Sequence, residues 1–174
     1  MNDLEIFEQW RTVSGFPNDQ VSNVGRVMNI KTGKVLKLKS NITTGYVSLK
    51  LSNQGILHDV YIHRLIAEAF LPVPDDPSIR CVDHIDRNRS NNALSNLRWV
   101  SHSYNQANRT KSLHKSSQYK GVRWRKDRNK WCAKITKDGI ERNLGYFENE
   151  IEAARAYNNK ALELFGEHAL SNDV

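Results

Sequence analysis

The sequence has few cysteines and no long hydrophobic run. Only two of its 174 residues are cysteines, Cys81 and Cys132, and they do not form a Cys-x-x-Cys pair. This spacing indicates neither a zinc site nor a disulfide framework, and it favours a reducing compartment. The amino terminus, Met-Asn-Asp-Leu-Glu, lacks the basic start and apolar segment of a secretory signal. We therefore expect a cytoplasmic protein without a membrane partner.

Basic residues outnumber acidic ones. There are 26 Lys and Arg against 19 Asp and Glu, a net charge of +7, and the pI is about 9.5. A hydrophobic fraction of 39% argues against a disordered chain. Excess positive charge favours a polyanionic partner, because binding releases counterions from nucleic acid. An anionic membrane surface is the alternative, but the sequence has no basic amphipathic helix with a bulky apolar face.

The most informative stretch runs from residue 79 to residue 105. A short apolar run ends in Asp83-His84, and a long loop rich in Asn, Ser and Arg follows it. Residues 97–100 alternate as in a strand with one buried face, and Ser101 is typical of the residue that caps a helix. The pattern predicts strand, long loop, strand and helix in that order.

Three polar side chains in this stretch suggest hydrolytic chemistry. The carboxylate of Asp83 and the amide of Asn105 are hard oxygen ligands, which suit Mg²⁺ or Mn²⁺ and not zinc. The imidazole of His84 is able to accept a proton near neutral pH. One divalent cation and one base are sufficient to hydrolyse a phosphodiester bond. His102, one turn before Asn105, is a weaker alternative ligand.

Asp83-His84, Asn96 and Asn105 together resemble the motif of HNH nucleases, the ββα-metal fold. The resemblance implies that Asp83 and Asn105 bind the metal and that His84 is the general base. It also implies that Asn96 braces the loop and orients His84, and that cleavage leaves a 5′-phosphate and a 3′-hydroxyl. Asn at the last position, instead of His, is found in phage-type members.

The segments before this stretch also resemble parts of homing nucleases. Trp10, Val21-Ser22-Asn23 and Gly25-Arg26-Val27 are similar to the NUMOD-type module that precedes HNH cores and helps to contact DNA. Alternation predicts short antiparallel strands at residues 34–39 and 45–51 of this part. Their lysines contact DNA or merely solvate the sheet, and the sequence does not favour either role. In the segment after it, His63 begins a predicted helix, where we expect a structural role more than a phosphate contact.

The C-terminal part divides into a basic and an acidic half. Residues 109–142 carry 12 Lys or Arg against 3 Asp or Glu, a net of +9. Residues 143–174 carry 2 basic and 6 acidic residues, a net of −4. Three alternating runs with an Asp-Gly turn predict a hairpin-built sheet, and a capping-box pattern at Asn149 predicts one helix. The sheet is therefore predicted to be the positive side.

This part resembles the APETALA2/ERF-type DNA-binding domain, on Tyr119-Lys120-Gly121-Val122-Arg123 and Leu144-Gly145-Tyr146-Phe147. The resemblance implies that the sheet enters the major groove of DNA. Lys126 to Asn129 and Asn143 depart from the plant pattern, so the plant target sequence does not transfer. With Arg98 of the HNH core, the expected DNA-binding residues are Lys120, Arg123, Arg125, Lys130 and Lys134.

We therefore predict an α+β protein with four parts. Residues 1–55 form an antiparallel β module, 56–108 the HNH core, 109–118 a basic linker, and 119–174 a three-stranded antiparallel sheet packed on one helix. The predicted function is a site-specific DNA endonuclease of the homing type, encoded by a phage or bacterium and acting on double-stranded DNA as a monomer. A transcription regulator with a vestigial nuclease motif is the main alternative, and an RNA nuclease is a third.

Overall fold

The computed structural model describes residues 7–108, 116–166 and 169–174, and it forms two compact units, Met1–Val100 and Ser101–Val174. Each unit contains small antiparallel sheets and few helices, so the prediction of an α+β fold is confirmed. Among the described residues, none of the helices has the length and apolar character needed to cross a lipid bilayer.

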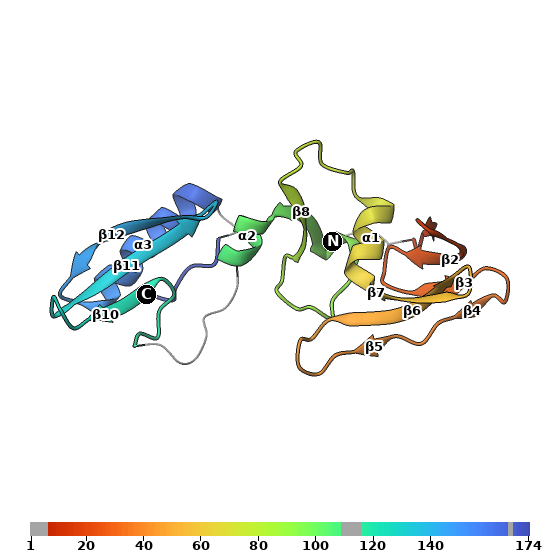
Figure 1. Cartoon of the computed structure of the whole chain (residues 1–174), viewed down its shortest axis with the longest axis horizontal. Coiled ribbons are helices and arrows are strands. Elements are labelled where there is room, and N and C mark those ends of the chain that lie inside the picture. The colour runs from red at the N-terminus through yellow and green to blue at the C-terminus, as the bar shows by residue number, and fades with distance from the viewer. Residues whose placement is uncertain (1–6, 109–115, 167–168) are drawn as a thin grey trace, which may run out of the picture. The chain divides into compact units, whose positions relative to one another are not determined.

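Two sheets build the first part of the N-terminal unit (Figure 1). The first contains β1 (Trp10–Val13), β2 (Phe16–Ser22), β3 (Val27–Asn29) and β4 (Lys34–Val35), in that order. The second contains β5 (Lys39–Ser40), β6 (Val47–Asn53) and β7 (Ile56–Tyr61). Both sheets are antiparallel, as the alternating sequence predicts.

The second half of this unit carries the motif residues. Helix α1 (Ile62–Phe70) buries Ile62, Leu65, Ile66 and Ala67, whose spacing matches one helical face. Strand β8 (Ile79–His84) pairs with β9 (Leu97–Ser101), and the short 3₁₀ helix η1 (Leu94–Asn96) lies in the loop between them. One hydrophobic core joins both halves, with Val21 and Val27 from the first sheet, Leu49 and Leu51 from β6, Ile62 and Ile66 from α1, and Val82 and Leu97 from β8 and β9.

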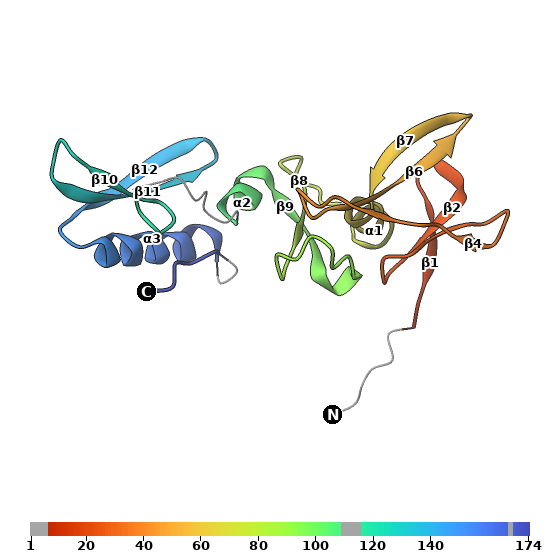
Figure 2. The same ribbon diagram turned by 90° about the horizontal axis from the view of Figure 1, so that it is seen from below.

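The C-terminal unit begins with helix α2 (His102–Ala107), whose first turn is capped by Ser101. Strands β10 (Val122–Arg125), β11 (Lys130–Lys137) and β12 (Ile140–Phe147) form its sheet, and α3 (Glu150–Phe165) covers one face of it (Figure 2). The packing is close, because a Cβ at Gly121 would lie 2.6 Å from the Lys134 carbonyl oxygen and against the Tyr157 ring. The predicted sheet and helix are thus confirmed.

Two local features differ from the sequence-based expectation. The alternating run at residues 34–39 predicts one strand, but β4 and β5 are two short strands in different sheets. The motif continues into α2, yet this helix packs with the C-terminal unit, where the Tyr104 ring makes an edge contact with Phe165 and Ser103 accepts a hydrogen bond from the Asp138 amide. The predicted linker lies largely outside the described residues.

Candidate active site

The loop between β8 and β9 is closed by a network of side-chain hydrogen bonds. The Asn96 amide donates to Asp86 Oδ1 at 2.8 Å and to the Asn91 carbonyl at 2.8 Å, and its oxygen accepts from the Asp86 amide at 2.9 Å. Asn91 and the backbone of Asn88 also donate to the Asp86 carboxylate. Because Asn96 is buried, its amide has protein partners where water is largely excluded. Asn96 therefore braces the loop.

Asp86 is the acceptor at the centre of this network. Its limited burial raises the pKa, but hydrogen bonds from Asn91, Asn96 and the Asn88 backbone outweigh that effect. The pKa of Asp86 is consequently lower than that of an ordinary aspartate. A charged Asp86 accepts bonds from several donors at once, and this keeps the first part of the loop in one conformation.

His84 ends β8 with its ring buried beneath the loop. Its Nε2 lies 3.1 Å from Asn92 Oδ1, and Asn92 Nδ2 donates in turn to the Ser90 carbonyl at 3.1 Å. The bond to Ser90 sets the orientation of the amide, so the Asn92 oxygen faces the ring and Nε2 carries the proton. The lone pair of the neutral imidazole is then on Nδ1, the nitrogen that is able to accept a proton.

Asp83 lies beside His84 in β8 and is buried. Arg98 of β9 donates to Asp83 Oδ2 through Nε at 3.0 Å and through Nη2 at 2.7 Å. Both side chains are mostly buried, at 19% and 10% exposure for Arg98 and Asp83. Arg98 therefore offsets the charge of a buried carboxylate. The sequence predicts that Arg98 contacts DNA. The structure shows in addition that Arg98 pairs with Asp83.

An aromatic cluster packs against the ring of His84. The His63 ring centroid lies 5.2 Å from that of His84, and Tyr46 of the β5–β6 hairpin stacks on His63 at 5.0 Å. His63 is 7% exposed, and its Nδ1 is buried without a hydrogen-bond partner. Burial, the nearby His84 and Arg64 together lower the pKa of His63 to about 4. His63 is therefore a neutral packing partner of His84 at physiological pH.

The predicted metal ligands have the right chemistry for a hard divalent cation. Asp83 offers a carboxylate from β8, and Asn105 offers an amide oxygen from α2, where it is half-buried. Asn105 belongs to the C-terminal unit, so its assignment as a ligand rests on its place in the sequence motif. The donor set is thus suited to Mg²⁺ or Mn²⁺.

The predicted DNA-binding residues of the C-terminal unit lie on β10, β11 and the turn before β10. Val122 and Ala133 face α3, so their strand neighbours Arg123 and Lys134 lie on the other face of the sheet. Several of these cations pair with carboxylates within the unit. Arg125 forms a bidentate pair with Asp127 at 2.8 Å, Lys130 lies 2.9 Å from Glu148, Lys134 contacts Glu141, and the backbone amide of Lys120 is held by Asn172 at 2.6 Å.

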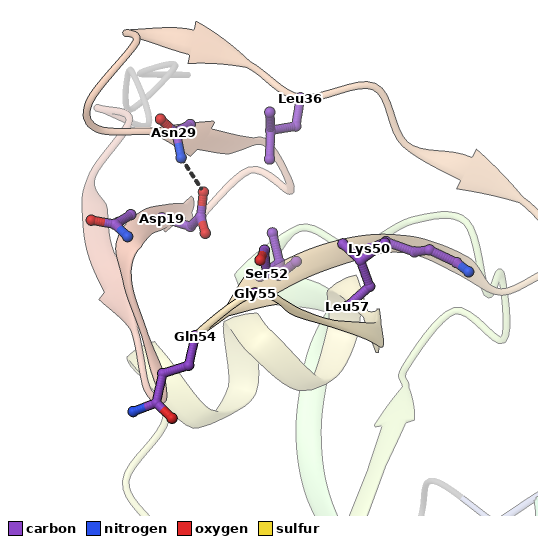
Figure 3. A pocket seen from close by; sticks show the side chains of 10 residues that line it. Asp19, Asn29, Leu36, Lys50, Ser52, Gln54, Gly55 and Leu57 are labelled. Carbon is purple, nitrogen blue, oxygen red and sulfur yellow. Dashed lines mark hydrogen bonds between the residues drawn. The ribbon is translucent and has the colours of Figure 1, made fainter.

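A separate pocket of the N-terminal unit contains none of the predicted site residues. It lies between the first sheet and the β6–β7 hairpin, and Figure 3 shows Asp19 accepting a hydrogen bond from Asn29 within it. Asp19 is buried, and the amide Nδ2 of Asn29 lies 2.9 Å from its carboxylate. The wall on the other side is formed by Lys50, Ser52, Gln54 and Leu57.

The structure adds site residues that the sequence did not identify. Asn92 holds the His84 ring, a role that the resemblance implies for Asn96, and Asp86 organises the loop. Both residues belong to an Asx-rich loop in which many side chains have equivalent hydrogen-bonding capacity, so spacing did not distinguish them. Tyr46 comes from a hairpin almost 40 residues earlier in the sequence, and no local pattern connects it to His84.

Comparisons with known proteins match both parts of the N-terminal unit. A family described as HNH endonuclease matches residues 60–107, and the NUMOD4 motif matches residues 8–52. The DNA endonuclease I-HmuI of Bacillus phage SP01 is 33% identical over 139 residues, which cover 77% of this chain and 76% of I-HmuI. These matches confirm the resemblances to HNH nucleases and to the NUMOD-type module. Neither family match extends to the C-terminal sheet.

Two viral proteins and a solved structure are also similar. The uncharacterized HNH endonucleases L560 and L245 of Acanthamoeba polyphaga mimivirus are 39% and 34% identical, over 66% and 56% of this chain. The chain spans only 56% and 28% of their lengths. A structure of the HNH homing endonuclease I-HmuI, which describes DNA binding and cleavage by that protein, has a TM-score of 0.55 and 27% identity, covering 95% of this chain and 94% of that one.

The lowered pKa of His63 predicts a pH-dependent stability. Between pH 6.5 and about 4 the unfolded chain binds a proton at His63 that the folded chain does not bind, so the free energy of unfolding falls as the pH is lowered. At pH 5 we expect a loss of roughly 2 kcal/mol relative to pH 7 from this residue. Urea denaturation at pH 7 and at pH 5 measures this difference in the free energy of unfolding.

The variant His63→Phe retains an aromatic ring at this position and should lose that part of the pH dependence. His58 is an exposed histidine of β7, so His58→Gln serves as the control and should behave like the wild type. An unchanged pH dependence in His63→Phe would contradict the assignment.

Proposed function

Because the chain belongs to the family of HNH homing endonucleases, we propose that it is a site-specific DNA endonuclease. The proposed reaction is the hydrolysis of a phosphodiester bond, which leaves a 5′-phosphate and a 3′-hydroxyl. The observation that best supports it is the buried pair at the end of β8, where Asp83 is held by Arg98 and the adjacent His84 is held by Asn92.

The proposed general base is His84. With Nε2 donating to Asn92, Nδ1 accepts a proton from water, and the resulting hydroxide attacks phosphorus in line. The bond between phosphorus and the 3′ oxygen breaks as the new bond forms. Because the His84 ring is packed against His63 and held by Asn92, it is positioned before the substrate binds, which lowers the entropic part of the barrier.

The proposed cofactor is Mg²⁺ or Mn²⁺, with Asp83 and Asn105 as its protein ligands. When bound, such an ion would stabilise the negative charge on the scissile phosphate and on the leaving oxygen. Arg98 holds the Asp83 carboxylate in one orientation, because its Nε and Nη2 both donate hydrogen bonds to the single oxygen Oδ2.

Double-stranded DNA is the proposed partner, bound by a monomer in the cytoplasm of a bacterial host. The C-terminal unit is proposed to act as an APETALA2/ERF-type domain, and its open sheet face would read the major groove through Arg123, Arg125, Lys130 and Lys134, with Lys120 beside it. Intramolecular pairs with Asp127, Glu141 and Glu148 would exchange for phosphates on binding, so affinity should depend on salt.

A transcription regulator with a vestigial nuclease motif is the less well supported alternative. The loop network is complete, since Asn96, Asp86 and Asn92 all make their hydrogen bonds and His84 and Asp83 both have partners. A transcription regulator would not need His84 to be held through Nε2 with Nδ1 left to accept a proton. An assay that measures both cleavage and DNA binding separates the two functions.

Replacing His84 by Ala should abolish cleavage while DNA binding persists. Loss of the general base is expected to slow cutting by about 10²- to 10⁴-fold, whereas affinity for the same DNA should stay near the wild-type value. Plasmid cutting with Mg²⁺ and an electrophoretic binding assay measure the two properties. A chelator should stop the wild-type reaction, and added Mg²⁺ or Mn²⁺ should restore it.

The exposed His58 offers a matched control, because His58→Ala removes an imidazole from the same unit. That variant should cut normally. Equal cutting by His84→Ala and the wild type would show that another group is the base. Binding of DNA without cutting by the wild type would favour the transcription regulator.

Asn92 should influence the proton affinity of His84. Asn92→Ala removes the acceptor at Nε2 and is expected to slow cleavage by about 10- to 100-fold. Asn92→Asp places a carboxylate at that position, which stabilises the imidazolium and should shift the acidic limb of the pH–rate profile to higher pH. Asn53→Ala, at the end of β6, is the control. A profile for Asn92→Asp identical to that of the wild type would refute the role.

The open face of the C-terminal sheet should carry part of the DNA affinity. Arg123→Ala is expected to weaken binding and to reduce the slope of log affinity against log salt by about 0.9, the value for one phosphate contact. Arg155 is an exposed arginine of α3, the helix that covers the opposite face, so Arg155→Ala should change neither quantity. Equal effects of the two variants would argue against the sheet as the DNA-binding surface.

A further inference from the structure

The turn between β5 and β6 holds a fully exposed isoleucine, Ile42, four residues before the Tyr46 ring that packs near His84. Ile42 is 101% exposed, whereas its neighbours in β6, Val47 and Leu49, are buried. Ile56, 63% exposed at the start of β7, is a less extreme example in the same unit. Exposed isoleucines are common on protein surfaces. Exposure alone therefore does not indicate a function for Ile42, and the position and rigidity of its turn have to be considered.

The turn is rigid despite its exposure. Asn41 Oδ1 accepts hydrogen bonds from the backbone amides of Thr43 at 3.0 Å and Thr44 at 2.9 Å. The Asn41 carbonyl accepts from the Gly45 amide at 2.7 Å, and the Asn41 amide donates to the Tyr46 carbonyl at 2.9 Å. Gly45 has a φ of +76°, which closes the turn. Ile42 is therefore held outward by a network of backbone bonds and does not sit on a loose loop.

The same turn is attached to the loop that follows β8. Arg89 of that loop donates to the Thr44 carbonyl at 2.8 Å, and its guanidinium lies 4.8 Å from the centre of the Tyr46 ring. Tyr46 in turn packs 6.1 Å from His84. Figure 1 shows the hairpin of β5 and β6, in orange, ending beside the green loop. The position of Ile42 relative to His84 is thus determined by direct contacts within one compact unit.

The surroundings of Ile42 suit a nucleic acid. Between residues 37 and 50 there are three lysines, Lys37, Lys39 and Lys50, and no acidic residue. Lys37, Lys39 and Arg89 are exposed. Lys37 and Lys39 precede the turn in the chain, and Arg89 is bonded to it. A rigid apolar side chain accompanied by cations is the combination by which proteins push a wedge between base pairs while they hold the phosphates. A β-branched side chain is well suited to this use, because it loses little rotamer freedom.

We propose that Ile42 is a wedge that inserts between stacked bases of the duplex close to the scissile phosphate. This inference rests on the proposed nuclease function. Partial unstacking would bend the duplex and expose the phosphate to His84, and the sequence-dependent cost of unstacking would contribute to the choice of site. Steps that unstack easily, such as TA, should be preferred at the wedge position.

The test compares cleavage of an intact duplex with cleavage of a duplex that is already distorted. Run-off sequencing of DNA cut by the wild type first gives the cut position. Ile42→Ala should then cut the paired duplex at least about tenfold more slowly than the wild type. A mismatch placed within a few base pairs of the cut should restore most of that rate, because it removes the need for unstacking. Ile42→Leu, which keeps an apolar wedge, should cut nearly as well as the wild type.

A direct measurement of unstacking uses 2-aminopurine at successive positions near the cut. In the His84→Ala background, which prevents cutting, the fluorescence of one position should rise on binding, and Ile42→Ala should remove that rise. Ile56→Ala is the matched control and should leave both rate and fluorescence unchanged. The folded structure should be unaffected, since Ile42 is fully exposed.

The outcomes separate the two proposals. If the wild type cuts and Ile42→Ala cuts equally fast, the wedge is wrong and the nuclease stands. If Ile42→Ala is slow on paired and mismatched DNA alike, with no change in fluorescence, Ile42 contributes to binding only and the wedge is again wrong. If the wild type cuts no DNA, the proposed function and the wedge fail together.

Discussion

The closure of the loop between β8 and β9 by Asp86 and Asn96 is the constraint on which the candidate site depends. A long polar loop has a high conformational entropy, and its ends would not hold an aspartate and a histidine in fixed positions without internal bonds. Asn96 joins the end of the loop to Asp86 near its start through both its amide oxygen and its amide nitrogen. The charged form of Asp86 is favoured by the same bonds. The loop is therefore ordered by charge-assisted hydrogen bonds, and Leu94 near its end also packs against the hydrophobic core.

The residues around His84 show how one small unit positions a reactive ring with few contacts. Asn92 bonds one nitrogen, and His63 and Tyr46 pack against the ring. The N-terminal sheets and the nuclease motif share one hydrophobic core, so the hairpin that carries Tyr46 belongs to the same compact unit as β8. This arrangement explains why a module that precedes the motif in sequence also shapes the site. In the C-terminal unit, by contrast, Arg125, Lys130 and Lys134 have carboxylate partners of their own, so DNA would have to replace existing ion pairs.

Much of the architecture was predictable because it depends on local periodicity. Alternation in residues 45–51 and 130–135 predicted strands that overlap β6 and β11, and the capping pattern at Asn149 predicted the start of α3. The residues 34–39 were misread as one strand, because their alternation does not reveal that the chain leaves one sheet and enters another. The placement of Asp83, His84 and Asn96 at the ends of two paired strands followed from the motif. Asn92 and Asp86 did not, since an Asx-rich loop admits many equivalent hydrogen-bond patterns and only the closed loop selects one.

The sequence by itself determined the composition of the site, namely a carboxylate and an imidazole at the end of a strand, an asparagine that braces the loop, and a basic sheet in the C-terminal part. These features depend on residue types and short spacings, which the chain carries in any conformation. Only the tertiary structure decided that Arg98 pairs with Asp83, that Asn92 holds His84, and that the turn with Ile42 is tied to the active-site loop through Arg89. Those contacts join residues up to 45 positions apart, and they arise from the packing of strands and loops in space, which no local pattern specifies.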